Sequence, residues 1–438
     1  MKINALKNWA FALLVFLAAS RMLGQENLVP PPKTDAEIKK MMGITYDLHV
    51  LPEGAKPEML EHLLEIGEVV VYYDHGIAIP WISAAGIMID APAEQVFSVL
   101  TDYTHYPSFV PMTDAVEVKK IRDNFVRVDF HLNVQMSFLK YRIDYGVYHN
   151  WRPPFRSDWA HAFGEFGINC GFAELIPTAD GKRTMFFYAV YSQPQSAFLK
   201  SIYAREPTVE VMTSLSTAIM FVRAMKAQSE KRVGTGKAKI AANLKPQRIL
   251  EALSEDPEGM KKILDRGNIL VLEDGPTVYA VGGGLVNAPI QAAYSVISDF
   301  KTHPQFIPGA KKVELLDSGK AGETYRWELL FNLAFFRYTQ DYEVTYQFTP
   351  PELITWQMPR PCCGPVSCFW KLIPLENKTM IFTGSSADVR SLGFIPKYAL
   401  EKEPTFEHAA LASQALVVIN SMKQRISEKN LGQPLPKK

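Results

Sequence analysis

The sequence has almost no net charge. Its 47 lysines and arginines balance 46 aspartates and glutamates over 438 residues. A nucleic-acid-binding protein needs a basic face, so the composition argues against that class of partner. After residue 25 the chain also lacks any apolar run near the roughly 20 residues that cross a bilayer. What is present, 47% hydrophobic and 11% aromatic residues, is typical of a folded globular protein with more than one domain.

Cysteine is scarce as well. Three of the four cysteines lie in "PCCGPVSC" (361–368), where a Cys363–Cys368 or a Cys362–Cys368 disulfide could close a small loop. The fourth is Cys170. No histidine lies within 30 residues of the cluster, and a zinc site needs more ligands at closer spacing. We therefore predict no metal and no other cofactor.

The first 25 residues form a separate segment. Lys2 and Lys7 precede an uncharged apolar run, Trp9–Ala19, which ends in small residues. This pattern is typical of a signal peptide and predicts a periplasmic or secreted protein. The alternative is an uncleaved N-terminal helix that anchors the protein to a membrane.

One stretch of the sequence occurs twice. Residues 91–111 read "APAEQVFSVLTDYTHYPSFVP" and residues 288–308 read "APIQAAYSVISDFKTHPQFIP", with eight of 21 positions identical. Average composition would give about one or two matches. The similarity extends well beyond this stretch on both sides and indicates two copies of a whole domain. The predicted organisation is a signal peptide (1–25), an N-terminal extension (26–55), a first domain (56–230), a linker (231–255), a second domain (256–428) and a tail (429–438).

Each copy shows the same order of elements. Two short strands lead into a helix that begins at Pro92 or Pro289, with Asp90 or Asn287 placed to cap it. Strands with alternating apolar and polar residues follow, which indicates an antiparallel sheet with one covered face. A long helix, 208–229 or 405–428, closes each copy and is the expected cover. We predict an α+β fold in which each copy can fold alone.

The stretch from Ala91 to Pro111, followed by a terminal amphipathic helix, resembles the START-like helix-grip superfamily. That superfamily includes lipid-transfer domains, polyketide cyclases and coenzyme Q-binding proteins. The resemblance covers nearly all of both copies. It implies a curved antiparallel sheet wrapped around the C-terminal helix, with a ligand cavity between them, and it implies fold more strongly than function because the superfamily holds both carriers and enzymes.

Large side chains on the inward register support such a cavity. Opposite them the terminal helices carry small residues, including Ala218 and Ala415, and large walls facing a small-residue cover can leave room for an apolar ligand. The alternative is an ordinary filled core in which aromatic rings pack over alanine. The candidate ligand-binding residues are Phe109, Phe130, Tyr141, Tyr145, Trp159, Phe306, Tyr325, Trp327, Phe331, Tyr338, Tyr342 and His408.

Catalytic residues are not predicted. His105 and His303 lie beside the repeated proline-rich segment but at different aligned positions, and His408 replaces Val211 on the second terminal helix. No phosphate-binding loop or nucleophile motif occurs. We expect an exported protein that binds or transports a lipid or another hydrophobic small molecule, one per copy. Transient contact with a membrane surface suits such a carrier. The alternative is a cyclase- or dehydratase-like enzyme acting on an apolar or aromatic substrate.

Overall fold

A computed structural model describes most of the chain. The predicted signal peptide and the cysteines at 362 and 363 lie outside the described residues. In the part that is described, no helix combines the length and apolar character needed to span a bilayer. The described residues are 28–74, 81–136, 139–194, 200, 207–235, 246–274, 278–319, 322–333, 336–357, 368–386 and 405–432.

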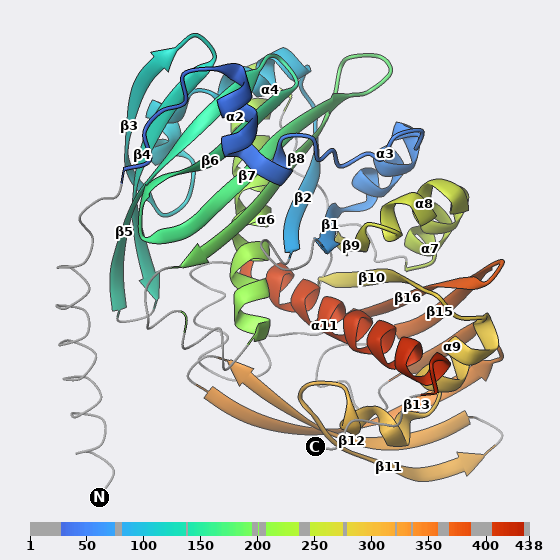
Figure 1. Cartoon of the computed structure of the whole chain (residues 1–438). Coiled ribbons are helices and arrows are strands. Elements are labelled where there is room, and N and C mark those ends of the chain that lie inside the picture. The colour runs from blue at the N-terminus through green and yellow to red at the C-terminus, as the bar shows by residue number, and fades with distance from the viewer. Residues whose placement is uncertain are drawn as a thin grey trace, which may run out of the picture.

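Sixteen strands of the described ranges form one antiparallel sheet that runs through both copies (Figure 1). Its order is β11-β12-β13-β14-β15-β16-β10-β9-β1-β2-β8-β7-β6-β5-β4-β3. The first copy contributes β1 (Glu68–Asp74), β2 (Trp81–Ile89), β3 (Thr113–Arg122), β4 (Phe125–Met136), β5 (Leu139–Arg152), β6 (Arg156–Gly164), β7 (Phe166–Pro177) and β8 (Thr184–Pro194). The second contributes β9 (Gly267–Glu273), β10 (Tyr279–Val286), β11 (Ala310–Gly319), β12 (Gly322–Leu333), β13 (Phe336–Thr349), β14 (Leu353–Gln357), β15 (Cys368–Leu375) and β16 (Lys378–Ser386).

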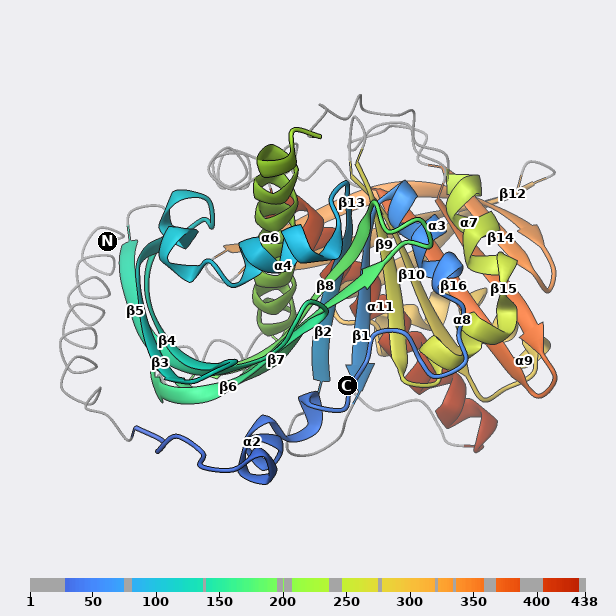
Figure 2. The same cartoon turned by 90° about the horizontal axis from the view of Figure 1, so that it is seen from above.

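Helices cover both faces of the middle of this sheet. The long helix of each copy packs on the inner face: α6 against β2 and β8, and α11 against β10, β9 and β16. Three short helices, α3, α7 and α8, lie on the opposite face (Figure 2). The helices are α2 (Asp35–Met42), α3 (Pro57–Ile66), α4 (Ala93–Leu100), α6 (Pro207–Val233), α7 (Pro246–Glu255), α8 (Pro257–Leu264), α9 (Ile290–Ile297) and α11 (Thr405–Asn430), with single 3₁₀ segments η1 (Gly43–Thr45), η2 (Tyr103–Ser108) and η3 (Phe300–Gln305).

Double coverage explains the sequence of the central strands. All residues of β2, β9 and β10 are buried, and strands buried on both faces carry continuous apolar runs instead of alternation. Towards the outer strands the sheet of the first copy curves around α6, as a helix-grip fold requires (Figure 2). The α+β helix-grip architecture predicted from the sequence is confirmed.

Two local details differ from the sequence-based expectation. Helices α4 and α9 have Pro92 and Pro289 themselves at the N-cap, with no side-chain cap, so Asp90 and Asn287 do not cap them. Part of the range predicted as a linker forms α7, which packs against α3. Its amphipathic pattern was hidden by the polar, glycine-containing residues that precede it.

Strands β1 and β9 join the two copies about a local two-fold axis. Val70 pairs with Leu270, the residue that corresponds to it in the second copy, and the flanking pairs are related by the same exchange. Gly67 and Gly267 permit this approach. A Cβ at Gly67 would lie 1.9 Å from the carbonyl oxygen of Leu272, and one at Gly267 would lie 1.8 Å from that of Tyr72.

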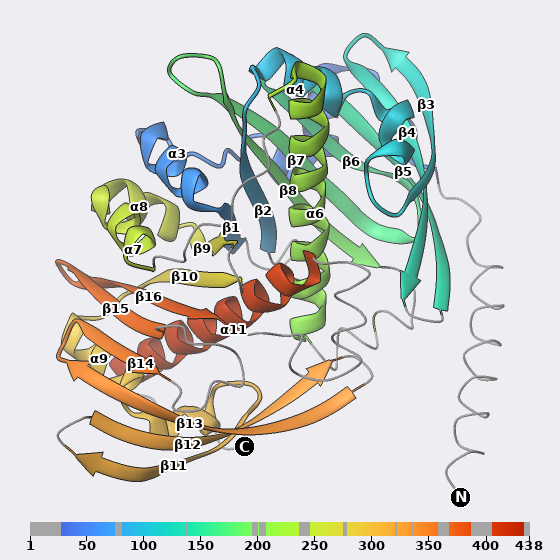
Figure 3. The same ribbon diagram turned by 180° about the vertical axis from the view of Figure 1, so that it is seen from behind.

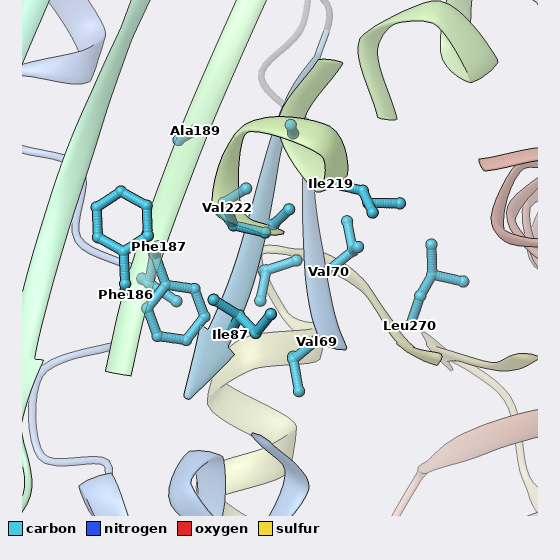
Figure 4. Packing of buried hydrophobic residues seen from close by; sticks show 14 of the residues in the cluster. Val69, Val70, Ile87, Phe186, Phe187, Ala189, Ile219, Val222 and Leu270 are labelled. Atoms are coloured by element: carbon cyan, nitrogen blue, oxygen red, sulfur yellow. The ribbon is translucent and has the colours of Figure 1, made fainter. Parts of the chain in front are cut away.

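The hydrophobic core extends across the paired strands β1 and β9, which form the seam between the two copies. Val70 of β1 and Leu270 of β9 belong to one buried cluster with Ile219 and Val222 of α6 (Figure 4). The same cluster continues into the first half of α11, which contacts α6 (Figure 3). The two copies therefore share a core, in contrast to the expectation that each carries a complete one of its own.

The outer face of the first copy is also covered. Residues 28–50 run across β5 and β6, where Ile38 and Met42 of α2 pack on Phe125 and Tyr148. The Tyr148 hydroxyl donates to the carbonyl of Val29 at 2.7 Å. The alternation of apolar and polar residues predicted that this face would be exposed to solvent. In the structure the N-terminal segment covers it.

Buried charges hold the N-terminal segment in place. Asp158 is fully buried and accepts from Arg156 at 2.8 Å and from Arg152 at 2.6 Å. Arg156 also donates to the carbonyl of Thr45 at 2.7 Å. Burial raises the pKa of Asp158, although the two arginines oppose this effect.

Candidate functional site

The repeated stretch forms a short elbow in each copy. In the first, the Tyr106 hydroxyl donates to the carbonyl of Leu100 at 2.5 Å, which ties η2 back to the end of α4. In the second, the aligned His303 Nε2 lies 3.3 Å from the carbonyl of Val296 and makes the same tie. The buried His303 therefore has a structural role, and burial lowers its pKa to about 4.

The interior of the first copy, between the sheet and α6, is lined by aromatic rings. Phe130 of β4 stacks on Tyr145 of β5 at 5.2 Å, and the elbow residue Tyr106 lies 6.3 Å from Phe130. Phe109 packs edge-on against Tyr106 at 5.4 Å, at the rim of the same group. These predicted residues come together as the sequence indicated.

A second aromatic group lies deeper in this interior. Trp159 of β6 stacks on Tyr188 of β8 at 4.7 Å, and Tyr188 lies 4.2 Å from Phe221 of α6. Gly171 on β7 makes room for the indole, since a Cβ there would lie 2.3 Å from the ring of Trp159. Burial raises the pKa of Tyr188 well above its usual range, so its phenol stays protonated.

A chain of polar groups runs through the same interior. Trp151 Nε1 donates to the Tyr103 hydroxyl at 3.1 Å. His149 Nδ1 lies 3.2 Å from Ser157 Oγ. His149 Nε2 is buried and has no hydrogen-bond partner among the described residues. Burial lowers the pKa of His149 to about 3, so the imidazole is neutral at physiological pH.

The interior of the second copy is aromatic but less polar. Phe300 of the elbow stacks on Tyr346 at 4.0 Å and lies edge-on to Tyr325 at 5.2 Å. Trp327 lies 6.1 Å from Phe300, and Trp356 lies 5.7 Å from Tyr346. The Tyr325 hydroxyl points to Glu323, to which it donates at 2.6 Å, so only its ring belongs to the interior. Tyr342 is half-buried against the same cluster.

A surface pocket of about 340 Å³ lies beside the second elbow. Phe306 lines it together with residues 307–311 at the start of β11 and Leu330 of β12. Phe306 also packs edge-on against His303 at 5.4 Å. Phe306, one of the candidate ligand-binding residues, thus lies at a surface pocket. The strands that carry Tyr141, Phe331 and Tyr338 are present, but their side chains lie outside the described part of the structure.

His408 lies in an ion network between the copies and not in an aromatic interior. Arg223 of α6 donates to Glu68 at 2.9 Å, to Asp274 at 3.2 Å and towards His408 Nε2 at 2.7 Å. His408 also contacts Asp274. Burial opposes ionisation of Asp274, yet His408 and Arg223 hold the pKa of this carboxyl well below its usual range.

Three members of this network have the chemistry to bind a metal ion. Ligand atoms of Glu68, Asp274 and His408 all lie within 4.8 Å of one another. The guanidinium of Arg223 lies among them and already supplies the positive charge that a cation would bring. These residues therefore fit an ion-pair network better than a metal site.

The small residues of the terminal helices serve close packing. A Cβ at Gly282 of β10 would lie 3.2 Å from the Cβ of Ala415, so Ala415 lets α11 lie directly on the sheet. Ala218 is fully buried in the shared core. These alanines thus face the middle of the sheet, and the aromatic interiors lie to the outer side of each helix.

Sequence reasoning missed the polar chain around His149. The signal was present in β5, where His149 follows Tyr145 and Val147 in strict alternation and must share their inward face. In the sequence Tyr103 follows the apolar face of the helix that begins near Pro92, although a tyrosine hydroxyl needs a partner when buried. Ser157 had no signal, because its neighbours in sequence are charged.

Comparison with known proteins identifies the family. The family described as "Polyketide cyclase / dehydrase and lipid transport" matches residues 89–166 and 286–427. The chain is similar in structure to the di-domain ARO/CYC StfQ from the steffimycin biosynthetic pathway, with 11% identity, 80% of this chain and 99% of that one covered, and a TM-score of 0.25. No curated protein matches the chain significantly.

Two single-domain structures are also similar. One is the Zhui aromatase/cyclase from Streptomyces, with 16% identity, 35% of this chain and 94% of that one covered, and a TM-score of 0.28. The other is a STAR-related lipid transfer protein from Xanthomonas axonopodis, with 13% identity, 37% and 94% covered, and a TM-score of 0.29.

Proposed function

Because this chain belongs to the family of polyketide cyclases, dehydrases and lipid-transport proteins, we propose that it binds and carries an apolar small molecule or lipid in each copy. The proposal rests on the aromatic interior of each copy, which is formed by the elbow, the curved strands and the terminal helix. The rings of Phe130 and Tyr145 in the first copy correspond to those of Trp327 and Tyr342 in the second.

The energetics favour an apolar ligand. Each buried methylene contributes about 0.8 kcal/mol, so a fatty-acid-sized chain reaches micromolar affinity without any charge contact. Tyr103, Tyr106, Tyr145 and Tyr188 keep their protons because burial raises the pKa of each. The interior therefore offers rings and neutral hydrogen-bonding groups to a ligand.

We also propose that the protein works in an exported compartment. The supporting pattern is the pair Lys2 and Lys7 before the apolar run Trp9–Ala19. N-terminal sequencing of the protein purified from its native cells should begin between about residues 20 and 26. An intact Met1 on a membrane-bound form would contradict export of a soluble carrier and favour the anchored alternative.

Ligand binding is tested with the mature protein. After removal of co-purified lipid, titration with an environment-sensitive fluorescent fatty acid should saturate with a micromolar dissociation constant. A photoreactive analogue then maps the site, and we expect crosslinked peptides from β4, β5 or α6 and from β12, β13 or α11. A folded protein that binds no apolar probe, or crosslinks confined to the outer sheet face, would rule out the carrier.

A cyclase- or dehydratase-like activity is the second candidate. It is favoured by one observation: a neutral His149 lies beside the hydroxyls of Ser157 and Tyr103, which suits proton transfer. Mass spectrometry of the co-purified ligand before and after incubation distinguishes the two functions. A product lighter by one water would identify a dehydratase, whereas an unchanged ligand supports the carrier.

A further inference from the structure

We infer that the first copy recognises a neutral acceptor oxygen of its apolar ligand, such as a ketone, through the Nε2–H of His149. The inference rests on the proposed function, since it concerns a ligand in that interior. It assigns to the first copy a donor at a position where the second copy holds Tyr346.

The hydrogen-bond chain has a fixed direction. Trp151 Nε1 can only donate, so it sets the starting point, and the Tyr103 oxygen accepts from it at 3.1 Å. The buried Ser157 hydroxyl needs an acceptor for its proton, and His149 Nδ1 lies within reach at 3.2 Å. Ser157 therefore donates to Nδ1.

The direction of the chain decides the tautomer of His149. Because Nδ1 accepts from Ser157, the single proton of the neutral imidazole is on Nε2. His149 thereby presents an N–H donor at the end of the chain. His149 is 8% exposed, and its Nε2 has no partner in the described ranges. A buried donor without an acceptor costs free energy, which an acceptor on the ligand would recover.

The donor faces the ligand-binding interior. His149 pairs across the sheet with Val126 and with Trp159, and directly paired residues share a face. Its ring lies 4.8 Å from Tyr103 and 5.8 Å from Trp159. A neutral donor among aromatic rings cannot offset the desolvation of a carboxylate, so a neutral carbonyl oxygen fits better.

The second copy lacks every member of this chain. The positions of Trp151, Tyr103 and Ser157 are occupied by Phe348, Phe300 and Ile354. The position of His149 holds Tyr346, whose ring stacks on Phe300. The second copy therefore has no imidazole donor at the position of His149. A buried donor of this copy without a hydrogen-bond partner in the described ranges is Trp327 Nε1 on β12.

The experiment compares two probes of nearly equal shape, acetylnaphthalene and ethylnaphthalene, which differ in a carbonyl oxygen. Each displaces the fluorescent fatty acid from the mature protein. We expect the wild type to bind the ketone about tenfold more tightly, the effect of one satisfied buried donor. His149→Phe should reduce this preference while both probes still bind, because the first copy then has no donor at this position. Tyr346→Phe, the matched change in the second copy, should leave it intact.

Two further measurements test the contact between His149 and the ligand carbonyl. Infrared spectroscopy should show the carbonyl stretch of bound acetylnaphthalene shifted to lower frequency in the wild type and less so in His149→Phe. In Ser157→Ala the Nδ1 atom of His149 loses its donor, so the imidazole proton can occupy either ring nitrogen. The ketone preference should then weaken several-fold, and this test remains available if His149→Phe does not fold. If both probes bind equally to the wild type, the inference is wrong and the carrier stands. If neither probe nor the fatty acid binds, the carrier itself fails.

Discussion

The two copies share the same fold and differ in the residues that line the interior and in the cover of the outer sheet face. Both close their elbow onto the preceding helix, through Tyr106 in one and His303 in the other. Only the first copy carries the polar chain that ends at His149 and the N-terminal segment on its outer face. The copies thus share the contact that closes the elbow and differ in the polar groups of the interior and in the cover of the outer face.

The seam between the copies shows the same contrast. Arg223 pairs with Glu68 in the first copy, and the corresponding residues of the second, Asn420 and Asn268, form an amide pair at 2.7 Å. Both pairs connect a terminal helix to a strand of the seam, α6 to β1 and α11 to β9. The charged pair also reaches Asp274 across the seam, so the first copy supplies the electrostatic contact between the two.

Separating the copies should have the largest effect. Fragments 26–235 and 246–438 each lose the β1–β9 pairing and the part of the shared core that the other copy supplies, so we expect neither to show a cooperative thermal transition alone. Mixing them should restore a transition if the seam forms in trans. Circular dichroism melts of each fragment and of the mixture measure this, and a fragment as stable as the whole chain would contradict a shared core.

Substitution of the seam glycines, Gly67 and Gly267, should have the second-largest effect on stability. Gly267→Ala and Gly67→Ala place a Cβ within 2 Å of a facing carbonyl oxygen, so each should lower the free energy of unfolding by about 4 kcal/mol or more. Gly319→Ala is the control, because its Cβ would meet only Asp317 Oδ2 at 3.7 Å. Urea denaturation compares the three. Equal stability of all three variants would show that β1 and β9 are not paired.

Removal of the buried carboxylate tests the outer cover. Asp158→Ala removes the nearer of the two carboxylates that pair with the buried Arg156 and should cost about 3 kcal/mol. Thr355→Ala is the matched change in the second copy, where the position has no such network, and should cost less than about 1 kcal/mol. Denaturation midpoints of both variants give the comparison. A loss shared equally by the two would contradict the role assigned to the N-terminal segment.

Substitution of the charged pair (Arg223–Glu68) or of the amide pair (Asn420–Asn268) at the seam should lower stability less than the changes above. Arg223→Met leaves Glu68 buried and unpaired, and we expect a loss of about 2 kcal/mol. Asn420→Leu removes a neutral hydrogen bond and should cost about 1 kcal/mol. High salt should change the first loss and leave the second nearly constant. If the order of the two losses is reversed, Arg223 does not hold the copies together.

The smallest expected effect is the loss of folding stability at acid pH. The unfolded chain protonates His149 near pH 6.5, whereas the folded chain resists protonation down to about pH 3 because of burial. Stability from this group is therefore lost as pH falls from about 6.5 towards 3, by about 1–2 kcal/mol at pH 5. His149→Phe should flatten this decline. His303→Phe should do so over a narrower range, since its pKa is about 4. Chemical denaturation between pH 5 and 7 measures both.

Much of the fold could be predicted because repetition and periodicity report it directly. The aligned prolines at 92 and 289 marked the start of equivalent helices, and alternation in residues 126–136 identified a half-covered strand. The seam could not be predicted, because a strand such as β1 is apolar whether it pairs within a copy or between copies. The N-terminal cover was missed since it has no second copy to align with.

The candidate site was predictable for its rings and less so for its polar groups. Phe130, Tyr145 and Trp159 were found from the inward register alone. His408 was placed in a ligand site because it replaces an apolar residue, but its partners Arg223 and Asp274 come from elements far away in sequence. The pairing of Ser157 with His149 likewise depends on the register between β5 and β6.

The central claim is that each copy binds one apolar ligand, and the most direct test is to count them. Native mass spectrometry of the mature wild-type protein, saturated with an apolar probe after delipidation, measures the number bound per chain. The account predicts two, with Tyr346→Phe unchanged and His149→Phe reduced only in its preference for a ketone. A folded chain that carries no probe at saturating concentration would contradict the claim.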